Sequence, residues 1–460
     1  MNTTPSHRSS RKKILAVMAL GATCAFGLSE ASAHVFLDCG VCSARKEEKK
    51  ADPSTLTFGT DLRLRYDYLD NLTWSAYRDG HDDAVISRLR AGFDYFPVKN
   101  VHVQLWGQYA DSWDNDGAWP TFRLEEDPDL YLANIEIKNI MDSPFTLKLG
   151  RQRLDYGDFR VIGLCDWANV GPYLWDAALL STRFENGFID IFYGHNYAKT
   201  ANTDHAFTLN HSHDFEGAGF YSHYQLPKGM PYLAIEPFFI VKWDDTEKYS
   251  GGQDLRDYNV GARSYGRNLL NRFDYDITYV DESGDYGNLD IDAYHFFAVA
   301  GATIHELPWT PRISLAYTVS SGDENPNDNK WQNYTTVFGV WGAEYGGEYN
   351  IFTFTNFEDR QINLEISPTE ELKVELRFHD YSLQEENGPW RGQTRRGGGD
   401  DIGNALEVEC RYLLTEHQDI GLLAGYFSPG DYAERAAGIN DNATWFVVDW
   451  HMNFSWELIK

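Results

Sequence analysis

The sequence predicts an all-β protein, a transmembrane antiparallel β-barrel of about 18 strands. Segments in which apolar and polar residues alternate recur along most of the chain. Aromatic residues make up 15% of the sequence, which suits girdles at the two faces of a membrane. Short turns alternate with long polar connections, and this asymmetry is typical of outer-membrane barrels.

Alternation is clearest in the first two expected strands. The first carries on one face the apolar residues Phe58, Leu62, Leu64, Tyr66 and Tyr68. Its other face carries Asp61, Arg63, Arg65 and Asp67. The second strand repeats the pattern, with Val85, Leu89, Ala91, Phe93 and Tyr95 opposing Arg88, Arg90 and Asp94. Because successive side chains of a strand point to opposite faces, each strand has one apolar and one polar face. Several such segments reach the roughly ten residues that a tilted strand needs to cross a bilayer.

Turn-forming residues separate the expected strands. Short turns are predicted at residues 96–100, 140–144 and 367–371, and long polar connections at residues 320–330 and 385–403. The polar run 195–213 leaves one assignment open. The strand number is therefore an even number from about sixteen to about twenty.

The N-terminal segment predicts export. Arg8, Arg11, Lys12 and Lys13 precede an apolar run, and Ala31-Ser32-Ala33 supplies a cleavage site. We expect a cleavable signal peptide at residues 1–33, a polar segment with a CxxC motif at 34–54 and a single barrel domain at 55–460. Beyond the signal, no apolar stretch reaches the length of about 18 residues that a membrane helix needs.

The final strand also favours the bacterial outer membrane. Phe446, Val448, Trp450, Met452 and Phe454 alternate with a second set of residues, Trp445, Val447, Asp449, His451 and Asn453. An amphipathic last strand that ends in an aromatic residue is typical of such barrels. Residues 455–460 continue beyond Phe454, which departs from the usual form.

Charge and cysteine usage limit the other functions. A net charge of -29 argues against a nucleic-acid partner and indicates acidic surface loops. In an oxidising compartment we expect a local disulfide between Cys39 and Cys42; a metal or redox role is the weaker alternative. No nucleophile elbow, P-loop or dinucleotide fingerprint occurs, so we predict neither an enzyme nor a cofactor or metal site.

A segment in the first half of the chain resembles the signature of the alginate-export porin family. It runs GRQRLDYGDFRVIG from Gly150 to Gly163 and continues with DWANVG at residues 166–171. The residues that carry the resemblance are Gly150, Arg151, Gln152, Arg153, Tyr156, Gly157, Asp158, Arg160, Trp167 and Asn169. Residues 321–326 and 425–432 are also similar, in the same order, so the likeness spans Thr55 to Phe454. Where the family tends to have Phe-Asp-Gly, this chain has Trp-Asp-Ala at 175–177.

The resemblance implies an arginine-lined barrel that lets an anionic polysaccharide, such as an alginate-like uronate, or its oligomers diffuse through. A general outer-membrane porin for small solutes is the first alternative. A secreted β-rich enzyme or binding module that acts on polysaccharide is an alternative from another class. The lipid bilayer is a partner in the first two cases, and periplasmic export proteins are compatible with the first.

Five arginines are expected to line the pore. Arg63, Arg65, Arg88 and Arg90 share the polar faces of neighbouring strands, and barrel closure would bring Arg411 towards them. We call these five residues the arginine wall. Guanidinium groups bind carboxylates bidentately and keep their charge, and fixed charges set the ion preference of a pore. The alternative is that nearby carboxylates pair with the arginines, which would then brace the barrel: Asp61, Asp67, Asp94, Glu407 and Glu409. We favour selection, because four arginines oppose three aspartates on the first two strands.

The arginines of the family motif also have two interpretations. Arg151, Arg153 and Arg160 either reach into the lumen or hold an inward-folded loop through pairs with Asp155, Asp158 and Asp166. We favour the second.

Overall fold

The computed structural model describes residues 54–71, 81–114, 126–163, 174–197, 215–227, 230–244, 253–325, 327–338, 355–386, 399–437 and 440–460. The expected signal peptide, the Cys39 and Cys42 pair, Trp167 and Asn169 lie outside these residues.

Within the described ranges the strands form one sheet that closes on itself. In its first half the strands are β1 (Thr55–Asp70), β2 (His81–Val98), β3 (Val101–Trp113), β4 (Glu126–Ile137), β5 (Phe145–Gln152), β6 (Leu174–Phe184), β7 (Gly187–Tyr197), β8 (Phe215–Gln225) and β9 (Tyr232–Asp244). The second half contains β10 (Leu255–Leu269), β11 (Phe273–Tyr286), β12 (Leu289–Thr303), β13 (Arg312–Ser320), β14 (Lys330–Trp331), β15 (Phe357–Ile366), β16 (Leu372–Ser382), β17 (Asp401–Thr415), β18 (Gln418–Pro429) and β19 (Ala443–Ile459). The 3₁₀ turn η2 (Ile140–Asp142) and the π-helical turn η4 (Ala433–Ala437) lie between strands.

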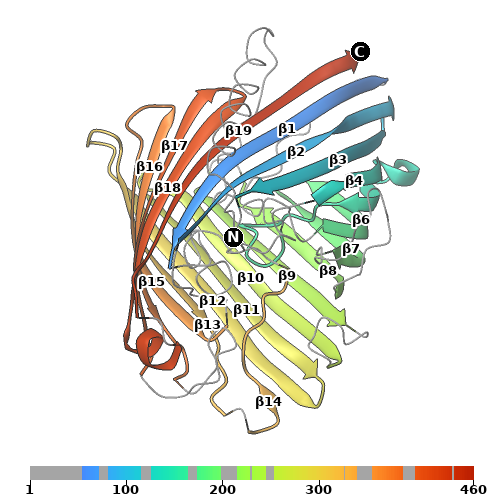
Figure 1. Cartoon of the computed structure of the whole chain (residues 1–460). Coiled ribbons are helices and arrows are strands. Elements are labelled where there is room, and N and C mark those ends of the chain that lie inside the picture. The colour runs from blue at the N-terminus through green and yellow to red at the C-terminus, as the bar shows by residue number, and fades with distance from the viewer. Residues whose placement is uncertain are drawn as a thin grey trace, which may run out of the picture.

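Eighteen of these strands build the barrel wall, which confirms the predicted fold. Each pairs antiparallel with its neighbours, and β19 pairs with β1 to close the ring. Figure 1 shows β19 in red beside β1 in blue. The remaining strand, β14, has two residues and runs parallel to β12, while β13 pairs directly with β15. The short turns predicted at 140–144 and 367–371 fall between consecutive wall strands, while the one predicted at 96–100 begins within β2 and ends just before β3.

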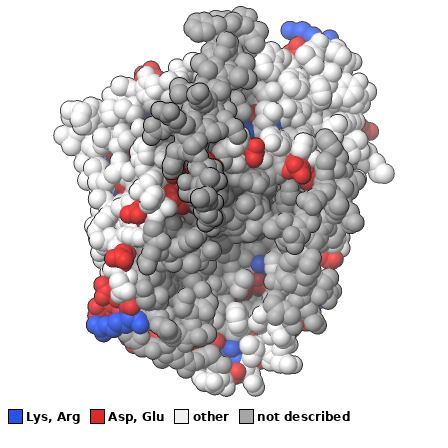
Figure 2. Space-filling view, in the orientation of Figure 1, with Lys and Arg blue, Asp and Glu red and all other residues white. Residues whose placement is uncertain are grey.

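The two faces of the wall differ as the alternation predicts. Exposed apolar side chains cover the outer face on many strands, among them Leu89, Leu105, Ile191, Val260, Leu315, Ile362 and Phe446. Uncharged residues make up most of the described surface visible in Figure 2. The inner face carries buried charged residues such as Arg65, Asp190, Glu236 and Arg377. This arrangement suits a wall with lipid outside and polar groups inside.

Among the described residues, no helix is long and apolar enough to cross a membrane.

Residues 455–459, which follow Phe454, belong to the last strand. In the β1–β19 ladder, Trp456 lies opposite Phe58 and Glu457 opposite Thr57. The rings of Phe58 and Trp456 stack with their centroids 5.8 Å apart. The C-terminal residues that depart from the usual form therefore lengthen the strand pair that closes the barrel.

Candidate functional site

The arginine wall lies on the inner face, as its parity predicts. Arg63, Arg65, Arg88 and Arg90 are each at most 5% exposed, and Arg63 lies directly opposite Arg88 in the β1–β2 ladder. Arg411 on β17 comes near them, because β17, β18, β19 and β1 are consecutive around the ring. Barrel closure thus brings the five arginines to one side of the interior.

Two of these arginines approach one carboxylate. Arg63 donates from Nε to Asp449 Oδ1 at 2.9 Å and from Nη2 to Asp449 Oδ2 at 3.3 Å. Nη2 of Arg411 lies 3.9 Å from Asp449 Oδ2, and its Nη1 donates to Asp419 at 2.5 Å. Asp449 therefore joins β19 to both β1 and β17.

The other arginines of the wall also have polar contacts inside the barrel. Arg65 donates to Asp67 at 2.7 Å, and Arg88 donates to Asp61 at 3.3 Å. Arg90 donates to the side-chain oxygen of Gln108 at 2.6 Å. The guanidinium carbon of Arg90 also lies 4.0 Å from the centroid of the Tyr131 ring. Asp61 and Asp67 thus pair with arginines, as the bracing alternative predicts.

The other three carboxylates of the bracing alternative contact mainly side chains outside the arginine wall. Asp94 accepts bonds from Gln104 and Trp106 and lies 2.9 Å from a ring nitrogen of His102. Glu407 and Glu409 pair with Arg377 on β16, at 3.2 Å each. Glu409 also lies 3.8 Å from Nε of Arg411, as the bracing alternative predicts. The sequence analysis did not single out Arg377, although it shares the inward parity of β16.

A loop folds into the barrel after β5. Residues 153–163, which we call the inward loop, place Leu154, Tyr156 and Ile162 among the buried core residues. The Tyr156 ring stacks on the inward-facing Tyr221 with centroids 4.6 Å apart. Its hydroxyl donates to Asp190 on β7 at 2.9 Å. The most conspicuous stretch of the family motif therefore forms a segment packed on the inner wall.

The motif arginines have partners that only partly match those expected. Arg153 pairs with Asp155 at 2.5 Å, and Arg160 pairs with Asp158 at 3.1 Å, both within the inward loop. Arg151 differs. Because it is still in β5, it reaches the neighbouring strand and donates to both carboxylate oxygens of Asp176 on β6, at 2.9 and 2.8 Å. Asp166 lies outside the described residues.

The start of the motif joins the inward loop to the wall. Gly150 has φ of 112°, and a Cβ there would lie 2.3 Å from the backbone oxygen of Ala133 on β4. Gln152 donates to the backbone oxygen of Ala177 on β6 at 2.9 Å. These contacts fix the point at which the chain leaves the sheet.

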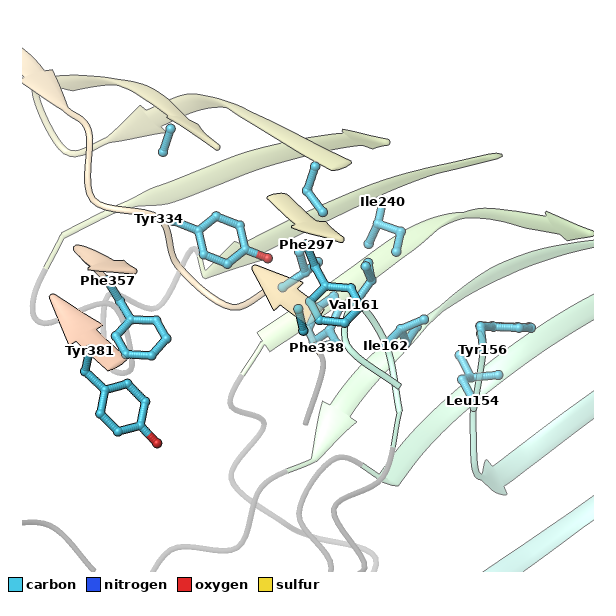
Figure 3. Close-up of a cluster of buried hydrophobic side chains, with 14 of the residues drawn as sticks. Leu154, Tyr156, Val161, Ile162, Ile240, Phe297, Tyr334, Phe338, Phe357 and Tyr381 are labelled. Carbon is cyan, nitrogen blue, oxygen red and sulfur yellow. The ribbon is translucent and has the colours of Figure 1, made fainter. Parts of the chain in front are cut away.

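A second segment, residues 332–338, also folds inward and meets the inward loop. Ile162 and Phe338 form a parallel bridge, and the Phe338 N–H donates to the Val161 oxygen at 3.0 Å. Figure 3 shows Val161, Ile162, Phe297 and Phe338 in one cluster. Buried Lys242 holds this segment from the wall, since its Nζ donates to the backbone oxygen of Thr336 at 2.9 Å.

In the part of the chain that the structure describes, no group of three or more His, Cys, Asp or Glu side chains is arranged to hold a metal ion.

Comparison with known proteins identifies both a family and a fold. A family model described as alginate export matches residues 54–447. The fold is similar to that of the outer-membrane protein OpdK from Pseudomonas aeruginosa, with a TM-score of 0.60, 12% identity and coverage of 87% of this chain and 99% of that one. It is also similar to OccAB1 from Acinetobacter baumannii, with a TM-score of 0.61, 12% identity and coverage of 89% and 99%. A structure of OpdK with vanillate gives a TM-score of 0.56, 14% identity and coverage of 87% and 99%. No curated protein matches the chain.

Proposed function

Because the chain belongs to the alginate export family, we propose that it lets an anionic polysaccharide of the uronate class, or its oligomers, diffuse passively across the membrane. The family and the eighteen-strand barrel identify an outer-membrane channel of bacteria, a transport protein rather than an enzyme. The substrate class and the passive mechanism are the proposed part.

The observation that carries the proposal is the arginine wall. Five arginines face one side of the interior, on β1, β2 and β17. Every residue of a uronate chain bears a carboxylate, and a carboxylate can accept the bidentate bond that Asp449 accepts from Arg63. The carboxylates of a moving chain would exchange with the aspartates that these arginines contact, and a row of such sites along the wall is what conduction through a multi-site pore requires.

Uronate oligomers added to one side of a planar bilayer test this proposal. We expect transient blocks of the channel current whose frequency rises with oligomer concentration. Neutral oligosaccharides of the same length are the control, and they should block far less often. Equal blocking by both would contradict the uronate assignment, because size alone would then explain it.

A general porin for small solutes is the second candidate, and the ion pairs of the interior favour it. Arg63, Arg65 and Arg88 each contact an aspartate of the barrel. Arginines whose charge is balanced locally brace the wall and impose little ion preference. This candidate predicts equal flux of charged and neutral solutes of one size.

A further inference from the structure

The inward loop lies against a charged cluster on the opposite wall from β1. Glu236 on β9, Arg263 on β10 and Asp276 on β11 form this cluster, which we call the seat. Arg263 Nε donates to Asp276 at 2.8 Å, and its Nη1 donates to Glu236 at 3.3 Å. The same guanidinium reaches the loop, since its Nε lies 3.5 Å from Asp158 Oδ2. Arg263, which is 1% exposed, thus contacts both neighbouring strands and the inward loop.

The loop presents Asp158 to the seat in a fixed orientation. Arg160 donates to it from Nη2 at 3.1 Å and from its backbone N–H at 3.2 Å. The Arg160 guanidinium in turn lies 3.4 Å from the centroid of the Phe297 ring on β12. Asp158 is therefore held by one arginine of the loop and contacts one arginine of the wall.

Next to Asp158, the backbone of the inward loop packs closely against the seat and Tyr221. Gly157 has φ of 60°, and a Cβ there would lie 2.6 Å from the Tyr221 hydroxyl and 3.3 Å from Arg263 Nη1. Tyr221 itself donates to Glu236 at 2.8 Å, and a ring nitrogen of His223 lies 2.8 Å from the same carboxylate. The seat is thus braced from β8 as well, and the loop can approach it only through a residue without a side chain.

We propose that Arg263 is a positioning residue that holds the inward loop against the seat through Asp158 and so sets the width of the channel. The loop lies inside the barrel, so its distance from the wall changes the cross-section open to solutes. Through the bridge between Ile162 and Phe338, displacement of the loop also moves residues 332–338. The inference requires that the chain be a channel and does not depend on which solute passes.

Single-channel recording of Asp158→Asn, Arg263→Gln and the double variant tests this role. Each single variant should populate a wider conductance level. A charge-assisted contact of this kind corresponds to a change of about tenfold in the ratio of time spent in the wide and narrow levels. Because both changes remove the same contact, the double variant should match the single ones rather than add their effects.

Arg312→Gln is the matched control. Arg312 on β13 also faces inward and pairs with two carboxylates, Asp274 and Glu365, but both lie on wall strands. We expect its conductance levels to equal those of the unmodified channel. Asp158→Glu, which keeps a carboxylate, should recover most of the narrow level.

Heat-modifiable migration on gels shows whether each variant forms its barrel. If Arg263→Gln does not fold, the conductance levels of Asp158→Asn test the proposal by themselves, because Asp158 is on the loop and not in the wall. A folded Asp158→Asn channel with unchanged levels would overturn the proposal. So would an equal change in Arg312→Gln, which would indicate a general effect of wall arginines.

Discussion

Arg63 and Asp449, which lie 386 positions apart in the sequence, form a bidentate ion pair across the β1–β19 seam. The pair stands on the inner face, where both side chains are nearly buried. Strand closure is thus supported by a side-chain contact as well as by the backbone ladder. Arg411 approaches the same carboxylate from β17, so Asp449 contacts two residues of the arginine wall.

The Asp449→Asn variant should destabilise the barrel strongly. It leaves Arg63 buried beside a neutral amide, and breaking a buried pair by changing one partner costs about 3–5 kcal/mol. We expect a lower urea midpoint in detergent, measured by tryptophan fluorescence and by heat-modifiable migration.

An exposed pair provides the control for the seam. Arg272 and Glu306 lie in the β10–β11 and β12–β13 turns, and their side chains are 45% and 64% exposed. Exposed pairs contribute about 0–1 kcal/mol, so Arg272→Ala should shift the midpoint little. Equal shifts in the two variants would show that the seam pair has no special role.

Replacing Arg88 and Arg90 with alanine should reduce the anion preference of the channel. Both guanidiniums are buried on the inner face of β2, and their removal leaves Asp61 and Asp94 on that side of the interior. Reversal potentials in a salt gradient measure the change. The general-porin alternative predicts instead that the parent channel has no anion preference for the variant to lose.

Arg360→Ala is the control for that double variant. Arg360 on β15 has the outward parity, with half of its side chain exposed beside Glu358. Its loss removes a positive charge from the chain without changing the interior. We expect the reversal potential to stay at the value of the unmodified channel.

Strand parity predicted the barrel well because each strand must satisfy lipid on one side and polar groups on the other. It therefore predicted the inner face for Arg63 and Arg88, where both side chains lie, and the count of about 18 strands was right. It could not give their partners, since Asp449 meets Arg63 only after the ring closes. Arg263 was missed for the same reason. Its role depends on a loop that returns from more than a hundred residues earlier in the chain, and alternation carries no information on that contact.

Gly157→Ala should disturb the inward loop. The added methyl group would lie 2.6 Å from the Tyr221 hydroxyl, at a backbone φ of 60° that favours glycine. We expect a loss of roughly 1–3 kcal/mol in stability and a less uniform conductance level. Urea titration and single-channel recording measure the two effects.

Gly399→Ala separates backbone strain from the steric contact. Gly399 also has a positive φ, 86°, but among the described residues no atom beyond its chain neighbours lies within 4 Å of its Cβ position. It should lose some stability through strain and keep a uniform conductance level. A similar loss of uniformity in both variants would exclude the Tyr221 contact as the cause.

The reversal potential of the purified channel in a planar bilayer, with a potassium chloride gradient across it, tests the central claim most directly. The arginine wall predicts a potential of the sign given by chloride passing more readily than potassium, and a shift towards zero as added uronate oligomers occupy the wall. A potential of the opposite sign, unaffected by the oligomers, would contradict the account.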